Sequence, residues 1–172
     1  DREYIEGVYW DSGWVSAYFA DKDKSLEASV QRPYILLTDL TLDNPLDLIP
    51  ALEAVRQAKG EGLVIIANDV KGAALNMLVT NNARGTLRLL ALKSPRYGEQ
   101  RSAILDDMAL STGARVVRTD AGDSIAQVTL QDLGRAQYVV CNRSAFARMG
   151  TMGSPPGIRD RVPTLREARR HI

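Results

Sequence analysis

The chain has 172 residues, 45% of them hydrophobic and 25% charged, which is the composition of a single folded domain with its own core. Its 22 basic and 21 acidic side chains nearly cancel, so no overall charge attracts nucleic acid or an anionic membrane. No apolar run approaches the roughly 20 residues that cross a bilayer, so we expect a soluble protein.

Cys141 is the only cysteine, which excludes an intrachain disulfide. It lies in the apolar run of residues 138–141, so a buried, unreactive thiol is the simplest interpretation. A lone thiol fits a reducing compartment, and we expect a cytoplasmic location. The sequence starts at Asp1 and ends in helix-forming residues, so we also expect residues 1–172 to be one domain cut from a longer subunit.

Residues 4–20 are rich in aromatic side chains and are interrupted by Gly7 and Gly13. This composition predicts a strand or an extended segment with turns, in which successive side chains alternate between two sides. One side carries Trp14, Ser16 and Tyr18, and the other carries Val15, Ala17 and Phe19. At least one large aromatic side chain therefore points away from the core if this segment lies at the surface.

A first helix is predicted after residues 27–30 and 34–38, which indicate either two short strands or one strand with an edge proline at Pro33. Asp43 or Asn44 is the expected cap, Pro45 suits the first helical position, and the helix is expected to end near Lys59. Ile49 opens an apolar shoulder beside the stripe that should face the core. That stripe consists of Leu48, Ala51, Leu52 and Val55.

Residues 63–94 predict one βαβ unit and hence a parallel sheet. Strands are expected at residues 63–67 and 87–92, with a turn at residues 69–72, a helix, and a stop at Gly85 between them. On this helix, Ala74, Met77 and Leu78 form one apolar stripe. Leu75 and Val79 lie about 100° round on a second flank, which indicates either a deeply buried helix or a binding surface.

The remaining chain predicts a helix and three short strands. The helix covers residues 99–112, buries a stripe made by residues 104, 105, 108 and 109, and ends at Gly113. A strand is expected at residues 115–118, and a turn at residues 120–123. Thr129 and Asp132 form a capping-box pattern that ends at Gly134, before a strand pair at residues 138–141 and 145–147. A final helix follows the break at residues 154–157.

Catalytic and metal-binding patterns are sparse. The only histidine is His171, so neither a histidine-dependent triad nor a histidine zinc site can be assembled, and no phosphate-binding loop is present. We therefore expect no metal, no cofactor and no catalytic residue in this chain. Two alternatives stay open. Asp69 is either a helix cap or the carboxylate of an α/β enzyme or ligand-binding domain, and the arginine-rich tail is either a solvated helix face or a nucleic-acid contact.

The order of these segments resembles the apical domain of GroEL-type group I chaperonins from about Glu6 to the C-terminus. The matching segments are residues 13–19 (GWVSAYF), 33–39 (PYILLTD), 49–55 (IPALEAV), 63–85, 93–98 (KSPRYG), 130–134 (LQDLG) and 157–162. Each match is weak alone, but all seven occur in the family's order with similar spacing.

The resemblance implies an α/β fold of the three-layer β/β/α kind, forming the polypeptide-binding domain of an ATP-dependent folding chaperonin. Non-native polypeptides and the mobile loop of a GroES-type co-chaperonin would bind an apolar groove between two helices. The implied binding residues are Trp14, Ser16, Tyr18, Phe19, Ile49, Leu52, Leu75, Val79 and Thr80. Gly7 matches the glycine at the family's hinge.

The resemblance also implies how the subunit is organised. The ATP and magnesium site would lie in a different domain, so this segment would be no enzyme and a monomer, whereas the full-length protein would form a heptameric ring. Some positions depart from the family. Trp14, Ala17 and Thr80 replace the usual Tyr, Pro and Val, while Ser12 and Lys71 stand where the family carries Arg and Glu.

Overall fold

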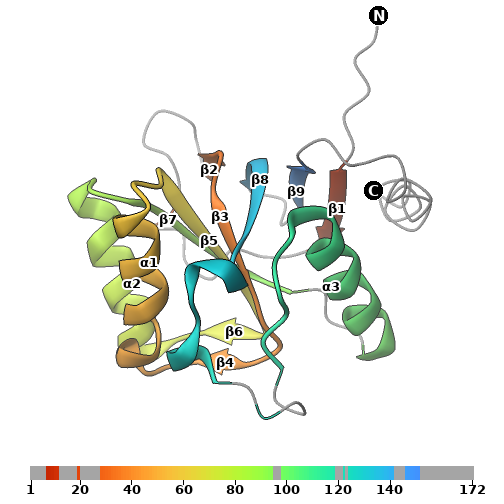
Figure 1. Cartoon of the computed structure of the whole chain (residues 1–172), viewed down its shortest axis with the longest axis horizontal. Coiled ribbons are helices and arrows are strands. Elements are labelled where there is room, and N and C mark those ends of the chain that lie inside the picture. Colours follow the sequence, from red (N-terminus) through yellow and green to blue (C-terminus); the bar gives the residue numbers. More distant parts are fainter. Residues whose placement is uncertain are drawn as a thin grey trace, which may run out of the picture.

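A parallel βαβ unit, which the sequence predicts, forms one end of the main sheet (Figure 1). In the computed structural model, β5 (Gly62–Ala67) pairs in parallel with β7 (Arg88–Lys93), and α2 (Gly72–Arg84) connects them. The structure describes residues 7–11, 19, 28–94, 98–118, 122, 124–141 and 146–151. Gly85 ends α2 in the left-handed conformation, with a φ of 79°, which only glycine adopts without strain.

Strands from both halves of the chain extend this unit into a mixed sheet, in the order β1-β9-β8-β3-β5-β7. Its further members are β1 (Gly7–Asp11), β2 (Ala28–Gln31), β3 (Tyr34–Leu37), β8 (Gly134–Cys141) and β9 (Phe146–Thr151). β3 runs parallel to β5, whereas β8 is antiparallel to β2, β3 and β9. A separate two-stranded sheet joins β4 (Thr41–Leu42) to β6 (Asp69–Val70).

β5 is buried along its whole length because other elements cover both of its faces. A Cβ atom added at Gly62 would lie 2.6 Å from Cγ1 of Val30, so β2 packs against one face of β5. Helix α1 (Ile49–Gln57) also contacts β5, and α2 contacts β7. Strands covered on both faces read as continuous apolar runs, which explains the sequence of residues 63–67.

The helices lie at opposite ends of the sheet in Figure 1, with α1 and α2 on the left and α3 (Gly98–Thr112) on the right. The predicted cap at Asn44 is confirmed, since its Oδ1 accepts a hydrogen bond from Leu46 N at 3.0 Å. It caps a short 3-10 turn, η2 (Pro45–Asp47), and α1 begins only at Ile49. Pro50 therefore lies in the first turn of α1, where its missing N–H has no helical partner to lose.

Two local predictions are wrong. Asp69 does not cap α2, because the N-cap is Lys71 and the Asp69 carboxylate instead accepts from Val70 N at 2.9 Å. Residues 115–118 form no strand, since only Val117 makes a bridge, with Thr38. The strand pair in the last third is confirmed but is longer than predicted, because residues 134–137 also belong to β8 and residues 148–151 to β9.

Within the described residues, no helix is long and apolar enough to cross a membrane. Trp14, Ser16, Tyr18, the turn around Asp120 and the arginine-rich tail with His171 lie outside the described residues.

Candidate functional site

Helices α1 and α2 lie beside each other with their C-terminal ends together. Both connect parallel strands of one sheet, so they run in the same direction. A concavity of about 520 Å³ joins these ends, with Arg56, Lys59 and Gly60 on the α1 side and Asn81 and Arg84 on the α2 side. Thr86 and Leu87 complete its lining. The C-terminal ends of the two helices therefore share a defined hollow.

The flank of α1 that leads to this hollow is apolar at its N-terminal end. Ile49 and Arg56 are seven residues apart, so they lie almost in line along the helix. Ile49 is 41% exposed, whereas Leu52, between them and closer to the core, is only 7% exposed. This flank of α1 therefore starts with an aliphatic side chain and ends with a guanidinium group.

Helix α2 presents two different flanks on either side of its buried stripe, Ala74 and Leu78. Asn81 and Arg84 line the hollow beside α1, and helical spacing places Met77 on the same flank. Leu75 and Val79 lie on the opposite flank, and both are partly buried against the core. None of the predicted residues Ile49, Leu52, Leu75 and Val79 lines the hollow, and their grouping in one binding surface stays a prediction.

The Leu75 flank of α2 is connected to β7 by hydrogen bonds. Asn82, on this flank, accepts from Arg88 Nη1 at 3.0 Å and from Leu89 N at 2.9 Å. Arg88 also donates through Nη2 to the backbone oxygen of Phe19 at 2.9 Å and through Nε to Ser29 O at 3.2 Å. One arginine thus links α2, β2 and the backbone of Phe19.

The remaining predicted binding residues differ in accessibility. Phe19 is fully buried in the core, so its side chain offers no surface for a partner, which contradicts its prediction as a binding residue. Thr80 is exposed on α2. Gly7 lies in β1, where a Cβ atom would meet the backbone oxygen of Met149 at 2.7 Å. Close strand packing thus accounts for this glycine, and its role as a hinge stays a prediction.

Sequence reasoning missed one strongly exposed apolar residue just before the start of α1. Leu46, in η2, is 70% exposed, the highest value for a large hydrophobic side chain in the described residues. Its position directly after the capping residue and proline was the available signal, because a helix entry normally needs no large apolar side chain. Met77 was assigned to the core stripe of α2, but it is only partly buried.

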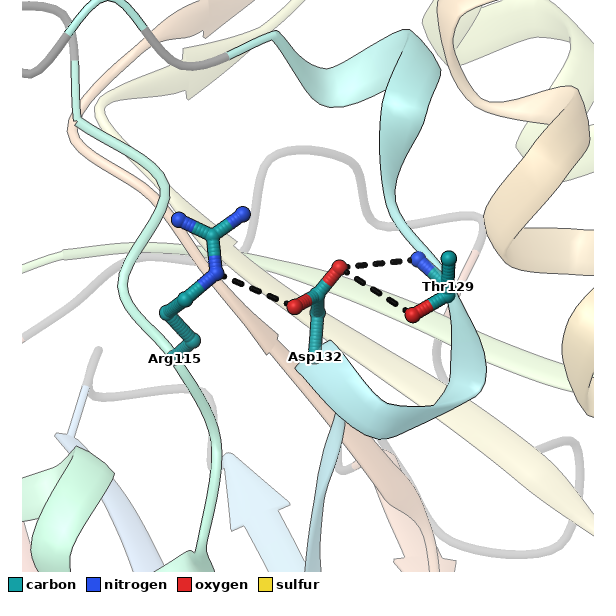
Figure 2. Close-up of polar contacts among 3 residues, drawn as sticks. All are labelled: Arg115, Thr129 and Asp132. Carbon is teal, nitrogen blue, oxygen red and sulfur yellow. Dashed lines mark hydrogen bonds and ion pairs between the residues drawn. The ribbon is translucent and has the colours of Figure 1, made fainter.

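A second concavity, of about 400 Å³, lies on the other side of α1. Pro50, Ala54 and Gln57 line it from the helix, and Leu130 of η5 (Leu130–Asp132) and its capping residue Thr129 line it from the other side. Leu130 is 37% exposed. The capping box predicted for this turn is confirmed, since Asp132 accepts from both the backbone N and the hydroxyl of Thr129 (Figure 2).

Charge stabilises the turn that supports this second concavity. Asp132 Oδ1 accepts from Arg115 Nε at 3.0 Å (Figure 2). Burial raises the pKa of Asp132, but the hydrogen bonds from Thr129 and Arg115 outweigh it, so the pKa lies below its ordinary value.

Burial also raises the pKa of Cys141 to about 11, which keeps this thiol protonated and supports the prediction of an unreactive cysteine.

No group of three or more potential metal ligands occurs among the residues that the structure describes.

The fold is that of a chaperonin-like domain. The chain is similar in structure to the chaperonin gp146 from the bacteriophage EL 2 (Pseudomonas aeruginosa), with a TM-score of 0.68. The similarity covers 94% of this chain but only 31% of that protein, and the sequences are 16% identical. No protein-family model matches the chain.

Proposed function

We propose that residues 1–172 form the apical, polypeptide-binding domain of a chaperonin subunit, with the three-layer β/β/α arrangement of such domains. Its groove between α1 and α2 binds non-native polypeptides and the mobile loop of a GroES-type co-chaperonin. The observation that carries this proposal is the pair of exposed aliphatic side chains Leu46 and Ile49 at the N-terminal end of α1, a helix whose C-terminal end shares a hollow with α2. The chaperonin-like fold of 94% of the chain supports it.

A non-native polypeptide exposes aliphatic side chains in no fixed order, so its receptor needs burial that tolerates different shapes. A groove between two helices provides this, because either a strand or a helix can lie in it. Burying about 300 Å² of apolar area at roughly 25 cal/mol per Å² contributes about 7 kcal/mol before the costs of ordering. A single domain should therefore bind weakly, and a ring of copies would add avidity.

The rest of the assembly follows from the same proposal. The full-length subunit would form a heptameric ring in the cytoplasm and hydrolyse ATP with magnesium in a separate domain, whereas this chain alone would be a monomer without ATPase activity. Magnesium-dependent ATP turnover by the purified chain, lost on Asp69→Asn, would contradict this part and favour the enzyme alternative.

Fluorescence anisotropy with a labelled, permanently unfolded model protein tests the binding surface. Ile49→Glu should weaken binding at least tenfold, because it places a charge in the apolar part of the groove. Leu110→Glu is the matched control, since Leu110 is 38% exposed on α3, away from the groove, and Ile49 is 41% exposed. Both variants should keep the thermal stability of the wild type within a few degrees.

Equal loss of binding in the Ile49 and Leu110 variants would show that general surface hydrophobicity, not the groove, captures the unfolded protein. No saturable binding by the wild type would contradict the proposed function itself.

A further inference from the structure

The hollow at the C-terminal ends of α1 and α2 is strongly basic. Arg56, Lys59 and Arg84 line it, all three are exposed, and no acidic side chain is part of its lining. The carboxylate of Glu53 lies 3.3 Å from Arg56 and neutralises part of its charge. Together, Glu53 and the three cations that line the hollow carry an excess of two positive charges.

Helix stabilisation explains only part of this charge. Arg56 and Arg84 occupy the last turns of their helices, where a cation interacts favourably with the helix dipole. Lys59 lies beyond the end of α1 in the left-handed conformation, with a φ of 60°. Glycine is the usual residue in that conformation, and any other residue costs roughly 1 kcal/mol there. The lysine thus adds a third cation at a position where helix capping would favour glycine.

The distance between the aliphatic and basic ends of the groove fits a short stretch of polypeptide. Ile49 and Arg56 are separated by seven residues of helix, or about 10 Å along its axis at 1.5 Å per residue. An extended chain covers this distance in about three residues, at roughly 3.3 Å each. A bound peptide with an aliphatic residue beside Ile49 would therefore place the residue about three positions further along beside Arg56.

We infer that this groove selects polypeptide segments in which acidic residues lie about three positions from aliphatic ones. The aliphatic side chains contact Leu46 and Ile49, and the carboxylates lie in the hollow between Arg56, Lys59 and Arg84. The inference rests on the proposed function, because it assigns the chemical class of segment that the same groove binds. The basic hollow raises the affinity for acidic segments. The apolar contacts with Leu46 and Ile49 bind any extended segment that has aliphatic side chains.

Three labelled peptides, measured by fluorescence anisotropy at low salt, test this inference. The first carries two leucines and, three positions on, two glutamates; the second has glutamines in place of the glutamates; the third has the glutamates directly beside the leucines. The wild-type chain should bind the first peptide about three- to tenfold more tightly than the second, as expected for exposed ion pairs. The third should bind with intermediate affinity, and added salt should abolish the preference.

Matched variants locate the effect. The double variant Arg56→Gln, Arg84→Gln should lose the preference for the acidic peptide and keep its affinity for the glutamine peptide. Lys71→Gln removes an exposed cation at the other end of α2 and should retain the preference. All these positions are exposed, and circular dichroism melting checks that each variant is folded.

The outcomes separate this inference from the proposed function. If the wild type binds the acidic and glutamine peptides equally, or if Lys71→Gln loses the preference as the double variant does, the inference is wrong while groove binding stands. If inorganic phosphate raises the melting temperature of the wild type but not of the double variant, and the peptides bind alike, the hollow is a simple anion site and the inference is also wrong. If no peptide binds, the proposed function fails first.

Discussion

The two flanks of α2 differ in composition and in surroundings. The flank with Leu75 and Val79 packs partly against the core and is tied through Asn82 to Arg88. The flank with Asn81 and Arg84 borders the open hollow beside α1. An apolar flank of an amphipathic helix is therefore not by itself a binding surface. The long-range contacts of that flank decide whether it supports the fold or remains open to a partner.

The largest expected effect is on the stripe between these flanks. Leu78 is fully buried, so Leu78→Glu should destabilise the chain by several kcal/mol and leave it largely unfolded at room temperature. The denaturant midpoint, followed by circular dichroism, measures this change.

Leu75→Glu and Val79→Glu are the comparison for this prediction, because both positions are only partly buried. Each should cost less stability than Leu78→Glu. If either variant unfolds as completely as Leu78→Glu does, this flank of α2 belongs to the core, and its assignment as a binding surface is wrong.

The second prediction tests the arginine that ties the Leu75 flank to the sheet. Arg88→Leu removes the donors to Asn82 and to the backbone oxygens of Phe19 and Ser29, and should cost about 2–4 kcal/mol. Arg84→Leu, four residues earlier on the open flank, should cost less than about 1 kcal/mol, the size of a helix-dipole effect. Urea denaturation of both variants measures the difference, and equal costs would show that the two flanks are equally supported.

The sequence predicts the local elements well where one pattern decides the structure. The apolar run of residues 63–67, the stop at Gly85 and the capping box of Thr129 and Asp132 each depend on neighbouring residues, and all are confirmed. The predicted strand at residues 115–118 fails because only Val117 finds a partner, Thr38, in a distant part of the chain. Strand pairing is a long-range property that a local apolar run does not determine.

The candidate site is less predictable from sequence than the fold. Helical periodicity finds both flanks of α2, but it contains no information about which flank meets α1. Lys59 and Arg84 are distant in sequence, and only the parallel packing of two crossover helices brings them into one hollow. The exposure of Leu46 likewise depends on α1 beginning at Ile49, after a short 3-10 turn, rather than at Pro45.

The third prediction concerns the support on the far side of α1. The pKa of Asp132 is lowered in the folded state, so its charge contributes stability that is present above the unfolded value of 3.8 and is lost as the pH falls through the lower folded value. Asp132→Asn should therefore cost about 1 kcal/mol at neutral pH, as for a lost helix cap, and little in acid. Thermal melts of both proteins from neutral to acid pH measure the difference in stability. A difference in melting temperature that does not change with pH would contradict the stabilising role of the Asp132 charge.

The smallest expected effect on stability is at the entrance of the groove. Leu46 is 70% exposed, so Leu46→Glu should change the free energy of unfolding by less than about 0.5 kcal/mol. If the open side of the groove binds polypeptide, the same change should weaken binding of a labelled unfolded protein several-fold, because a charge then lies where aliphatic side chains must be desolvated.

Leu48→Glu, two residues further on, is the control for burial, since Leu48 is fully buried and this variant should unfold. A Leu46→Glu chain that is as stable as the wild type and binds as tightly would restrict the binding surface to residues beyond η2. The exposed leucine would then have no part in recognition.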